Sequence, residues 1–389
     1  MLGDILFIIF LMMGSCYCIK SWAHSQGFSS NQTAWLFGLW VYHLLIGLVF
    51  YQYILSHGGD SYRYWTIGSV NPELTNGWWD YFGTSTYFMY WVNYPFSQIA
   101  GLGYLSGTIL YASLSYFGFL LAFQLLKASF NKFRNRVFYQ VIVLILFLPN
   151  VHFWTGGIGK EAFLWLGLVM VLSGIHHFSD KLILIIAGLL LSLMVRPIQG
   201  LVLTISVLMV LPFHKTLIPY RKKIFPLAIF MILSIFAYRY IKGSLIYGFN
   251  LEWIGEILDW QNQFLASFRG GSSVDMQGYN WIEKLVTVFF RPFIWEARDF
   301  WSLAAGIENT FLAIIFCIAV YSLFYLKGRI NIPLYLWTAL IYGMLLSVLY
   351  SITLNNLGII MRMKSICIPF FIIIASYLYF EVANKRAKV

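Results

Sequence analysis

The sequence predicts an all-α, polytopic transmembrane helix bundle. Of its 389 residues, 60% are hydrophobic and only 11% are charged, whereas about 25% are charged in a typical soluble domain. The mean hydropathy of +0.74 agrees, because a soluble core of this size could not bury so much apolar surface. Basic residues also recur in short loops between the apolar stretches, which is the pattern that orients membrane helices.

About eleven stretches are long and apolar enough to be candidate membrane spans. A further aromatic segment, 85–103, is expected to form an interfacial or re-entrant helix. The chain shows no repeat, linker or low-complexity tract, so a single membrane domain is expected over residues 1–389. The candidate spans are 2–19, 34–55, 104–126, 137–150, 161–176, 181–195, 198–213, 224–241, 308–326, 333–353 and 365–383.

Charge predicts the orientation of these helices. Alternate loops are rich in lysine and arginine and poor in acids, and the positive-inside rule places such loops in the cytoplasm. The N-terminus is then outside and the C-terminus is cytoplasmic. Two long segments, 56–103 and 242–307, fall on the outer face, and the second contains an amphipathic stretch, 249–268, that could lie on the membrane or pack on the bundle. The basic loops hold Lys20, Lys127, Lys132, Arg134, Arg136, Lys181, Lys215, Arg221, Lys222, Lys223, Lys327, Arg329, Lys385, Arg386 and Lys388.

The net charge of +11 would suggest a nucleic-acid partner in a soluble protein. Here the basic residues lie between apolar spans, so membrane topology and anionic lipid explain them better, and no nucleic-acid motif is present. The four cysteines have neither the spacing of a zinc site nor that of a disulfide framework. No zinc site, disulfide framework or nucleic-acid partner is therefore expected.

The first polar motif of the outer face is HGGDSYRYW, directly after the second span. Gly58 and Gly59 allow the backbone to bend close to a ligand. Asp60 could act as a general base, a metal ligand or the partner of Arg63. The alternative is structural: Asp60 would cap a helix that begins at Ser61.

The second motif, FWTGGIGKEAF, lies at the outer start of the fifth span. Its glycines are expected to leave backbone N–H groups accessible before a helix N-terminus, with Lys160 as an added cation. Such an arrangement binds anions, although its spacing does not fit a Walker A loop. The alternative is a plain helix start with a local pair between Lys160 and Glu161.

Arginines gather on the same predicted face. Arg196 lies in MVRPIQG between two short spans, where Pro197 would break the helix, and it could also simply extend to the interface. Arg291, Glu296 and Arg298 crowd into FFRPFIWEARDFW, where a structural ion-pair network is the alternative. The arginine guanidinium donates two parallel hydrogen bonds to one phosphate group. An arginine near lipid is costly in free energy unless it is paired. A lipid phosphate or pyrophosphate is therefore expected as ligand, bound by Arg63, Lys160, Arg196, Arg269, Arg291, Arg298 and Arg362.

The motifs HGGDSYRYW, GGIGKE, RPFIWEARD and NNLGIIMR, with ten or more helices and the long outer segment 242–307, resemble bacterial surface-polysaccharide polymerases. These are the Wzy-type polymerases of O-antigen and capsule and the EpsG-like group of exopolysaccharide assembly. The resemblance covers the whole chain in plan. It implies a multi-pass glycosyltransferase of the bacterial cytoplasmic (inner) membrane, which transfers a growing glycan from undecaprenyl pyrophosphate to the acceptor sugar of a lipid-linked repeat unit.

The resemblance also implies roles for individual residues. Arginines would hold the pyrophosphates and stabilise the leaving group, while a carboxylate would deprotonate the acceptor hydroxyl. Asp60 or Glu161 is the expected base, and Glu296 would orient Arg291 or serve as an alternative base. Neither a metal nor a nucleotide is required. The expected partners are undecaprenyl-pyrophosphate-linked glycans, membrane lipid and, in some systems, a chain-length regulator.

Other functions compete with this prediction. A GT-C glycosyltransferase that uses a polyprenyl-phosphate sugar would also carry an acidic residue on an outer loop, often with a metal. An acyltransferase would need a well-placed histidine, and His57 and His152 are the outer-face histidines of the predicted topology. A lipid-linked glycan transporter or flippase is favoured by the short spans around Arg196, and a scaffold would require none of this chemistry.

Overall fold

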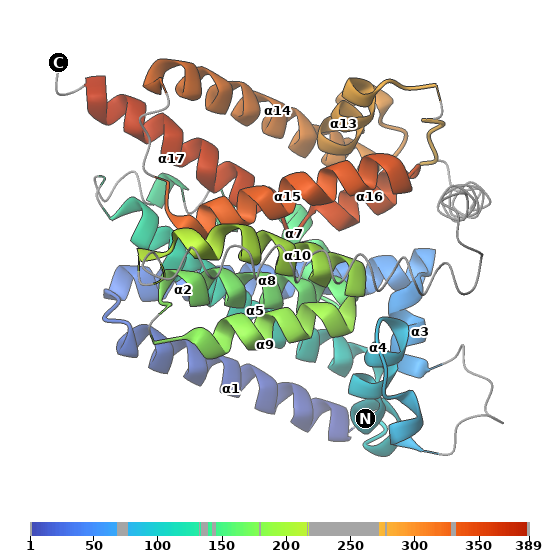
Figure 1. Cartoon of the computed structure of the whole chain (residues 1–389). Helices are drawn as coiled ribbons and strands as arrows, with labels where there is room; N and C mark the ends of the chain where they lie inside the picture. Colours follow the sequence, from blue (N-terminus) through green and yellow to red (C-terminus); the bar gives the residue numbers. More distant parts are fainter. Residues whose placement is uncertain are drawn as a thin grey trace. The chain divides into compact units, whose positions relative to one another are not determined.

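The computed structural model describes residues 2–67, 77–131, 133, 139–141, 145–178, 180–215, 217, 272–276, 278–327 and 332–386. These residues form helices and no strand, apart from one isolated β-bridge between Ser273 and Asn356. The prediction of an all-α fold is thus confirmed for the described part (Figure 1). Several predictions lie outside the described residues. They are the span 224–241, the amphipathic stretch 249–268, Arg269, and the basic residues Lys132, Arg134, Arg136, Arg221, Lys222, Lys223, Arg329 and Lys388.

The chain divides into two compact units, Met1–Leu203 and Thr204–Val389, here called unit 1 and unit 2. The single membrane domain expected over 1–389 stays a prediction. One helix, α10 (Pro197–Val210), followed by the 3-10 turn η4 (Leu211–Phe213), crosses the boundary between the units.

Unit 1 is built around two helices, α5 (Tyr104–Phe130) and α8 (Lys160–His176), whose side chains are mostly buried. Helix α5 packs against α1, α2 and α8, and α8 packs against α9. Small residues permit the last contact, because a Cβ added at Gly167 would lie 2.9 Å from the Gly188 carbonyl oxygen. The remaining elements are α1 (Leu2–Ser25), α2 (Ser30–His57), α3 (Asp60–Thr66), η2 (Trp78–Tyr81), α4 (Thr86–Tyr94), η3 (Pro95–Ile99), α7 (Pro149–Thr155) and α9 (Leu182–Val195).

The described residues of unit 2 include three long helices, one helix of ten residues and two shorter elements. Helix α14 (Phe300–Leu326) packs against α17 (Ile368–Arg386), and α15 (Leu334–Thr353) packs against α17 and α13 (Trp281–Phe290). The short elements are η6 (Ile294–Glu296), which packs on α14, and α16 (Leu357–Lys364), which leads into α17.

Six of the described helices are long and apolar enough to cross a membrane: α1, α2, α5, α14, α15 and α17. A seventh span is present if α7 and α8 count as one, since they pass the same test together but bend by 113° at their junction. Two shorter apolar segments, Leu182–Val195 and Pro197–Phe213, follow. The chain is therefore a multi-pass helical membrane protein with six or seven spans among the described residues, whereas the sequence predicts eleven.

Several helices begin at a different residue from the prediction, and two of these differences affect the position of an acidic residue. Helix α14 begins at Phe300 rather than at residue 308, because Asp299 caps it: its carboxylate accepts the Ser302 N–H at 2.7 Å. Glu308 therefore lies inside this helix. Helix α3 begins at Asp60, with Gly59 in the N-cap position at a φ of 141°, so the expectation that Asp60 caps a helix from Ser61 is wrong.

Candidate functional sites

The junction between α7 and α8 is the segment Gly156–Gly159, in which all four residues are buried. It lies against α2, where a Cβ added at Gly47 would stand 2.5 Å from the Gly156 carbonyl oxygen. The Gly156 N–H already donates to the His152 carbonyl at 2.7 Å. The expectation of accessible backbone N–H groups is therefore wrong for this loop, since the glycines serve close packing against α2.

An ion pair joins the first turn of α8 to the break between α9 and α10. Arg196 caps the C-terminus of α9, and Pro197 opens α10. The Arg196 guanidinium donates from Nη2 to Glu161 Oε1 at 2.6 Å, and 2% of the Glu161 side chain and 19% of the Arg196 side chain are exposed. A buried carboxylate is thus matched by an arginine from a different helix break, which is the arrangement that makes such charges tolerable in a membrane protein.

Lys160 is the first residue of α8 and is only 7% exposed. Its ammonium donates to the Ser85 hydroxyl at 2.9 Å and to the Thr86 hydroxyl at 3.1 Å, and it lies 5.4 Å from the centre of the Tyr64 ring. Ser85 is fixed in turn, because its N–H donates to the Met194 carbonyl at 2.7 Å. Lys160, Glu161 and Arg196, with these partners, form what we call the α8 cluster.

Asp60 and Arg63 are exposed on α3. Tyr64 follows Asp60 by one helical turn, so the two residues share a face of the helix. Because the Tyr64 ring contacts Lys160, the short helix that carries Asp60 lies beside the α8 cluster. Unit 1 therefore brings five predicted site residues into one neighbourhood.

A buried histidine pair lies elsewhere in unit 1. His43 and His152 are fully buried, and their Nδ1 atoms are 2.8 Å apart. His43 Nε2 lies 2.9 Å from the Ser115 hydroxyl, and His152 Nε2 contacts the Leu146 carbonyl. A carbonyl only accepts, so His152 carries its proton on Nε2 and His43 donates from Nδ1, with both rings neutral. His152 is thus a packed interior residue, and its position toward the outer face stays a prediction.

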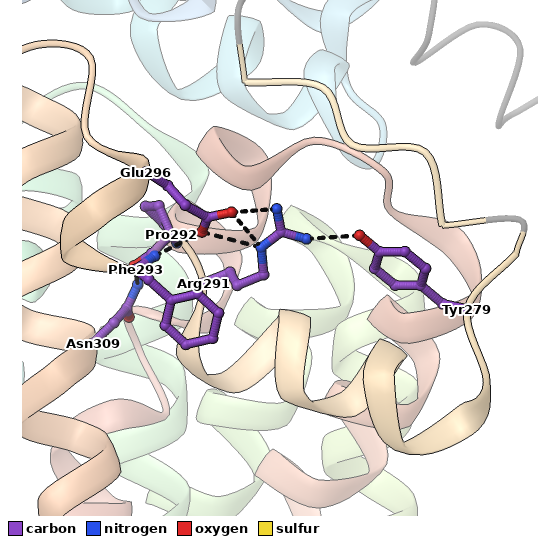
Figure 2. A network of polar contacts seen from close by, with 6 residues as sticks. All are labelled: Tyr279, Arg291, Pro292, Phe293, Glu296 and Asn309. Atoms are coloured by element: carbon purple, nitrogen blue, oxygen red, sulfur yellow. Dashed lines mark hydrogen bonds and ion pairs between the residues drawn. The ribbon is translucent and has the colours of Figure 1, made fainter.

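The polar network of unit 2 centres on Arg291, at the end of α13 (Figure 2). Its guanidinium clasps Glu296: Nε donates to both carboxylate oxygens, at 2.9 and 3.1 Å, and Nη2 also donates to Oε1. On the other side Nη1 donates to the Tyr279 hydroxyl at 3.0 Å. The arginine is therefore held in one orientation from two directions, and the predicted ion-pair reading of this motif is confirmed for Arg291 and Glu296.

Both members of this pair have shifted pKa values. The hydrogen bonds that Arg291 donates to Glu296 raise the pKa of Arg291 above its usual value, against the effect of burial. Burial alone would raise the pKa of Glu296, but the bonds from Arg291 and from the Phe293 N–H outweigh it, and the pKa falls below the usual value. Glu296 is therefore a stable carboxylate that orients Arg291. A carboxylate with a lowered pKa is a poor proton acceptor.

The backbone beneath Arg291 is held by two buried side chains. The Lys364 ammonium donates to the Phe289 carbonyl at 2.9 Å and to Asn309 Oδ1 at 2.8 Å, with a longer contact of 3.5 Å to the Arg291 carbonyl. Asn309 Nδ2 donates to the Pro292 carbonyl at 3.0 Å (Figure 2). Burial lowers the pKa of Lys364 to about 7, partly opposed by Glu308. We call Tyr279, Arg291, Glu296, Asn309 and Lys364 the Arg291 cluster.

Two other predicted phosphate-binding residues of unit 2 are described, and the positive charge of Arg298 helps to lower the pKa of Glu296. Arg298 is exposed just before α14, and Arg362 is half-buried in α16. Sequence patterns did not identify Ser85, Thr86, Tyr279 or Asn309 as site residues, because single hydroxyls and amides carry no distinctive spacing. Lys364 was not predicted as a site residue either, because its separation of 55 residues from Asn309 gave no indication of their contact.

The fold and the two clusters define a class: a multi-pass helical membrane protein with arginines held by glutamates at helix ends. Among the described residues no group of three or more His, Cys, Asp or Glu side chains is arranged to hold a metal ion. Compared with known proteins, the chain matches no family model, no curated protein and no solved structure.

Proposed function

We propose that this protein is a polymerase of lipid-linked oligosaccharide repeat units at the outer face of a bacterial cytoplasmic membrane. It would transfer a growing glycan from undecaprenyl pyrophosphate to the acceptor sugar of the next unit. The observation that carries the proposal is shared by both units: an arginine at a helix end is held by a glutamate close to a buried lysine. Such oriented guanidinium groups suit phosphate recognition.

The number of clusters agrees with the chemistry. A polymerase of this kind handles two lipid-linked molecules, the growing chain and the incoming unit, and each carries a diphosphate. We assign one diphosphate to the α8 cluster of unit 1 and one to the Arg291 cluster of unit 2. The predicted orientation, with the N-terminus outside and eleven spans, belongs to this proposal because it turns both clusters toward the outer leaflet.

Among the three predicted bases, Asp60 is the best supported. Asp60 is exposed on α3 beside the α8 cluster, whereas only 2% of the Glu161 side chain and 24% of the Glu296 side chain are exposed. In the proposed step Asp60 accepts the proton of the acceptor hydroxyl, and the hydroxyl oxygen bonds to the anomeric carbon of the growing glycan. The bond from that carbon to the diphosphate breaks, and arginines stabilise the negative charge that the leaving diphosphate gains.

The test is chain extension in proteoliposomes that contain purified protein and authentic lipid-linked repeat units, with EDTA and without nucleotide sugar. Arg291→Lys keeps the charge and loses the fork, so it should slow extension by roughly 100-fold if the fork stabilises the leaving group. Asp60→Asn should abolish extension, and Lys385→Gln, at the exposed end of α17, is the matched control. A product ladder in the Arg291 and Asp60 variants that equals the wild-type ladder would contradict the assigned roles.

The same experiment separates the GT-C alternative. An enzyme of that class would extend nothing from diphosphate-linked units under EDTA. It would gain activity when a divalent metal and a polyprenyl-phosphate monosaccharide are supplied.

A lipid-linked glycan flippase is the second candidate, and the 113° bend between α7 and α8 favours it. Broken helices with charged residues at the break are typical of transporter sites. A flippase would move fluorescent lipid-linked glycan across the liposome bilayer without lengthening it. Transport without extension would therefore replace the polymerase assignment by this one.

A further inference from the structure

Helices α1 and α2 of unit 1 line a groove of about 730 Å³. Its lining is mixed. Aromatic rings alternate with a lysine, a histidine and hydroxyl groups, and the lining residues include Tyr17, Lys20, His24, Ser30, Thr33 and Phe37. Neither cluster uses these residues, so the groove requires an explanation of its own.

The polar and apolar parts of the groove lie at different depths. Helix α1 ends at Ser25 and α2 begins at Ser30, and both are candidate membrane spans, so the turn between them lies at a membrane surface. At a rise of 1.5 Å per residue, Tyr17 and Phe37 lie roughly 12 and 10 Å below these helix ends. Lys20 and Thr33 lie closer to the surface. The groove therefore changes from polar to apolar in the direction of the bilayer interior.

Positive charge collects at its polar end. Lys20 comes from α1, which also supplies His24 to the lining. Lys127 comes from α5, with its ammonium 4.2 Å from the centre of the Phe28 ring and 3.2 Å from Gln32 Oε1. Phe28 is itself a lining residue, so this second lysine borders the groove. The capped N-terminus of α2 at Ser29 adds the positive end of a helix dipole.

We propose that this groove binds one anionic phospholipid of the surrounding bilayer. The headgroup phosphate would meet Lys20, His24 and the hydroxyls of Ser30 and Thr33, and an acyl chain would lie over Tyr17 and Phe37. Both parts of such a lipid match the groove, because the anionic headgroup fits the cationic end and a hydrocarbon chain fits the aromatic end. The inference is independent of the polymerase proposal.

Native mass spectrometry of the full chain in detergent tests it, with phosphatidylglycerol and phosphatidylcholine of the same acyl chains offered together. The wild type should retain phosphatidylglycerol preferentially. A lysine near a membrane surface contributes about 1 kcal/mol to anionic-lipid binding, so Lys20→Gln should weaken binding about five-fold. Lys20→Arg should restore it, and Lys385→Gln, which removes an exposed lysine at the end of another span, should leave it unchanged.

Ala34→Trp tests the space inside the groove independently of its charge. The tryptophan side chain fills the groove at a lining position and leaves every charged residue unchanged. It should weaken phosphatidylglycerol binding as much as Lys20→Gln does. Glycerol 3-phosphate, which has the headgroup anion and no chains, should not displace the lipid. Equal retention of the two lipids, full binding by the Ala34 variant, equal losses in the Lys20 and Lys385 variants, or displacement by glycerol 3-phosphate would each overturn the proposal.

Discussion

Replacing Lys364 by methionine should lower the free energy of unfolding. The substitution keeps most of the side-chain volume but removes the donor that serves the Phe289 carbonyl and Asn309 Oδ1. A buried acceptor left without a donor costs about 1–3 kcal/mol. Because methionine also avoids the desolvation of a buried ammonium, part of this loss is offset, and a net destabilisation of about 2–3 kcal/mol is expected at neutral pH.

The loss should grow as the pH rises. The pKa of Lys364 is about 7 in the folded protein and lies near 10.5 without the fold. Between these values the unfolded chain binds more protons than the folded chain, so the wild type gains stability with rising pH, by up to about 1.4 kcal/mol per pH unit. This contribution is complete above the unfolded pKa and is lost as the pH falls through about 7. The methionine variant has no such group and cannot gain it.

The assay is unfolding of the purified protein in detergent, followed by intrinsic fluorescence from about pH 6.5 to about pH 9.5. The quantity of interest is the difference in unfolding free energy between wild type and variant, because other groups titrate in both. Lys385→Met provides the control, since Lys385 is exposed on the last turn of α17. A difference that stays constant over this range would refute the lowered pKa of Lys364. A variant as stable as the wild type would refute the stabilising role of the Lys364 hydrogen bonds.

Three further predictions concern packing and pairing. Glu161→Gln should destabilise the protein by about 3 kcal/mol, since it leaves the half-buried Arg196 without its carboxylate. In a double-mutant unfolding cycle, Glu161→Gln with Arg196→Met should cost less than the sum of the single changes. Gly47→Ala should reduce the yield of folded protein on gel filtration, because its Cβ would stand 2.5 Å from the Gly156 carbonyl oxygen, whereas Gly38→Ala, with open space around it, should not. Asp299→Ala should cost about 1 kcal/mol of unfolding free energy through loss of the α14 cap, and Asp299→Asn should recover most of it.

The helices were the most predictable part of the structure. A span in a bilayer must satisfy its own backbone and present apolar side chains, so length and hydropathy alone locate α1, α2 and α5 to within several residues at each end. The start of α14 was missed by eight residues because a cap is a local hydrogen bond, from Ser302 to Asp299, and not a change in hydropathy. The number of spans was less predictable, since short apolar helices satisfy composition without reaching the length of a span.

The sites were predictable as residues but not as partnerships. Arg291 and Glu296 are five positions apart, so their pair could be foreseen from the motif. Glu161 and Arg196 are 35 positions apart, and only the packing of α8 against α9 brings them together. The glycines of the α7–α8 junction misled the prediction for a similar reason: the composition of an anion-binding loop is also the composition of a loop that packs closely against a helix.

One physical principle explains where the charged residues of both clusters lie. A charged side chain in a membrane protein is tolerated where a partner offsets its desolvation, and helix ends provide such places because the backbone itself is polar there. Arg196 lies at a break enforced by Pro197, and Arg291 lies at the end of α13 before Pro292. In both cases a glutamate orients the guanidinium in the absence of any ligand. Anion binding at such an arginine therefore costs less conformational entropy. An apolar pair of similar volume would stabilise the fold as well as these ion pairs do. Stability alone therefore does not account for the preorganised arginines, and this is the physical reason to seek the ligand of this protein at these two positions.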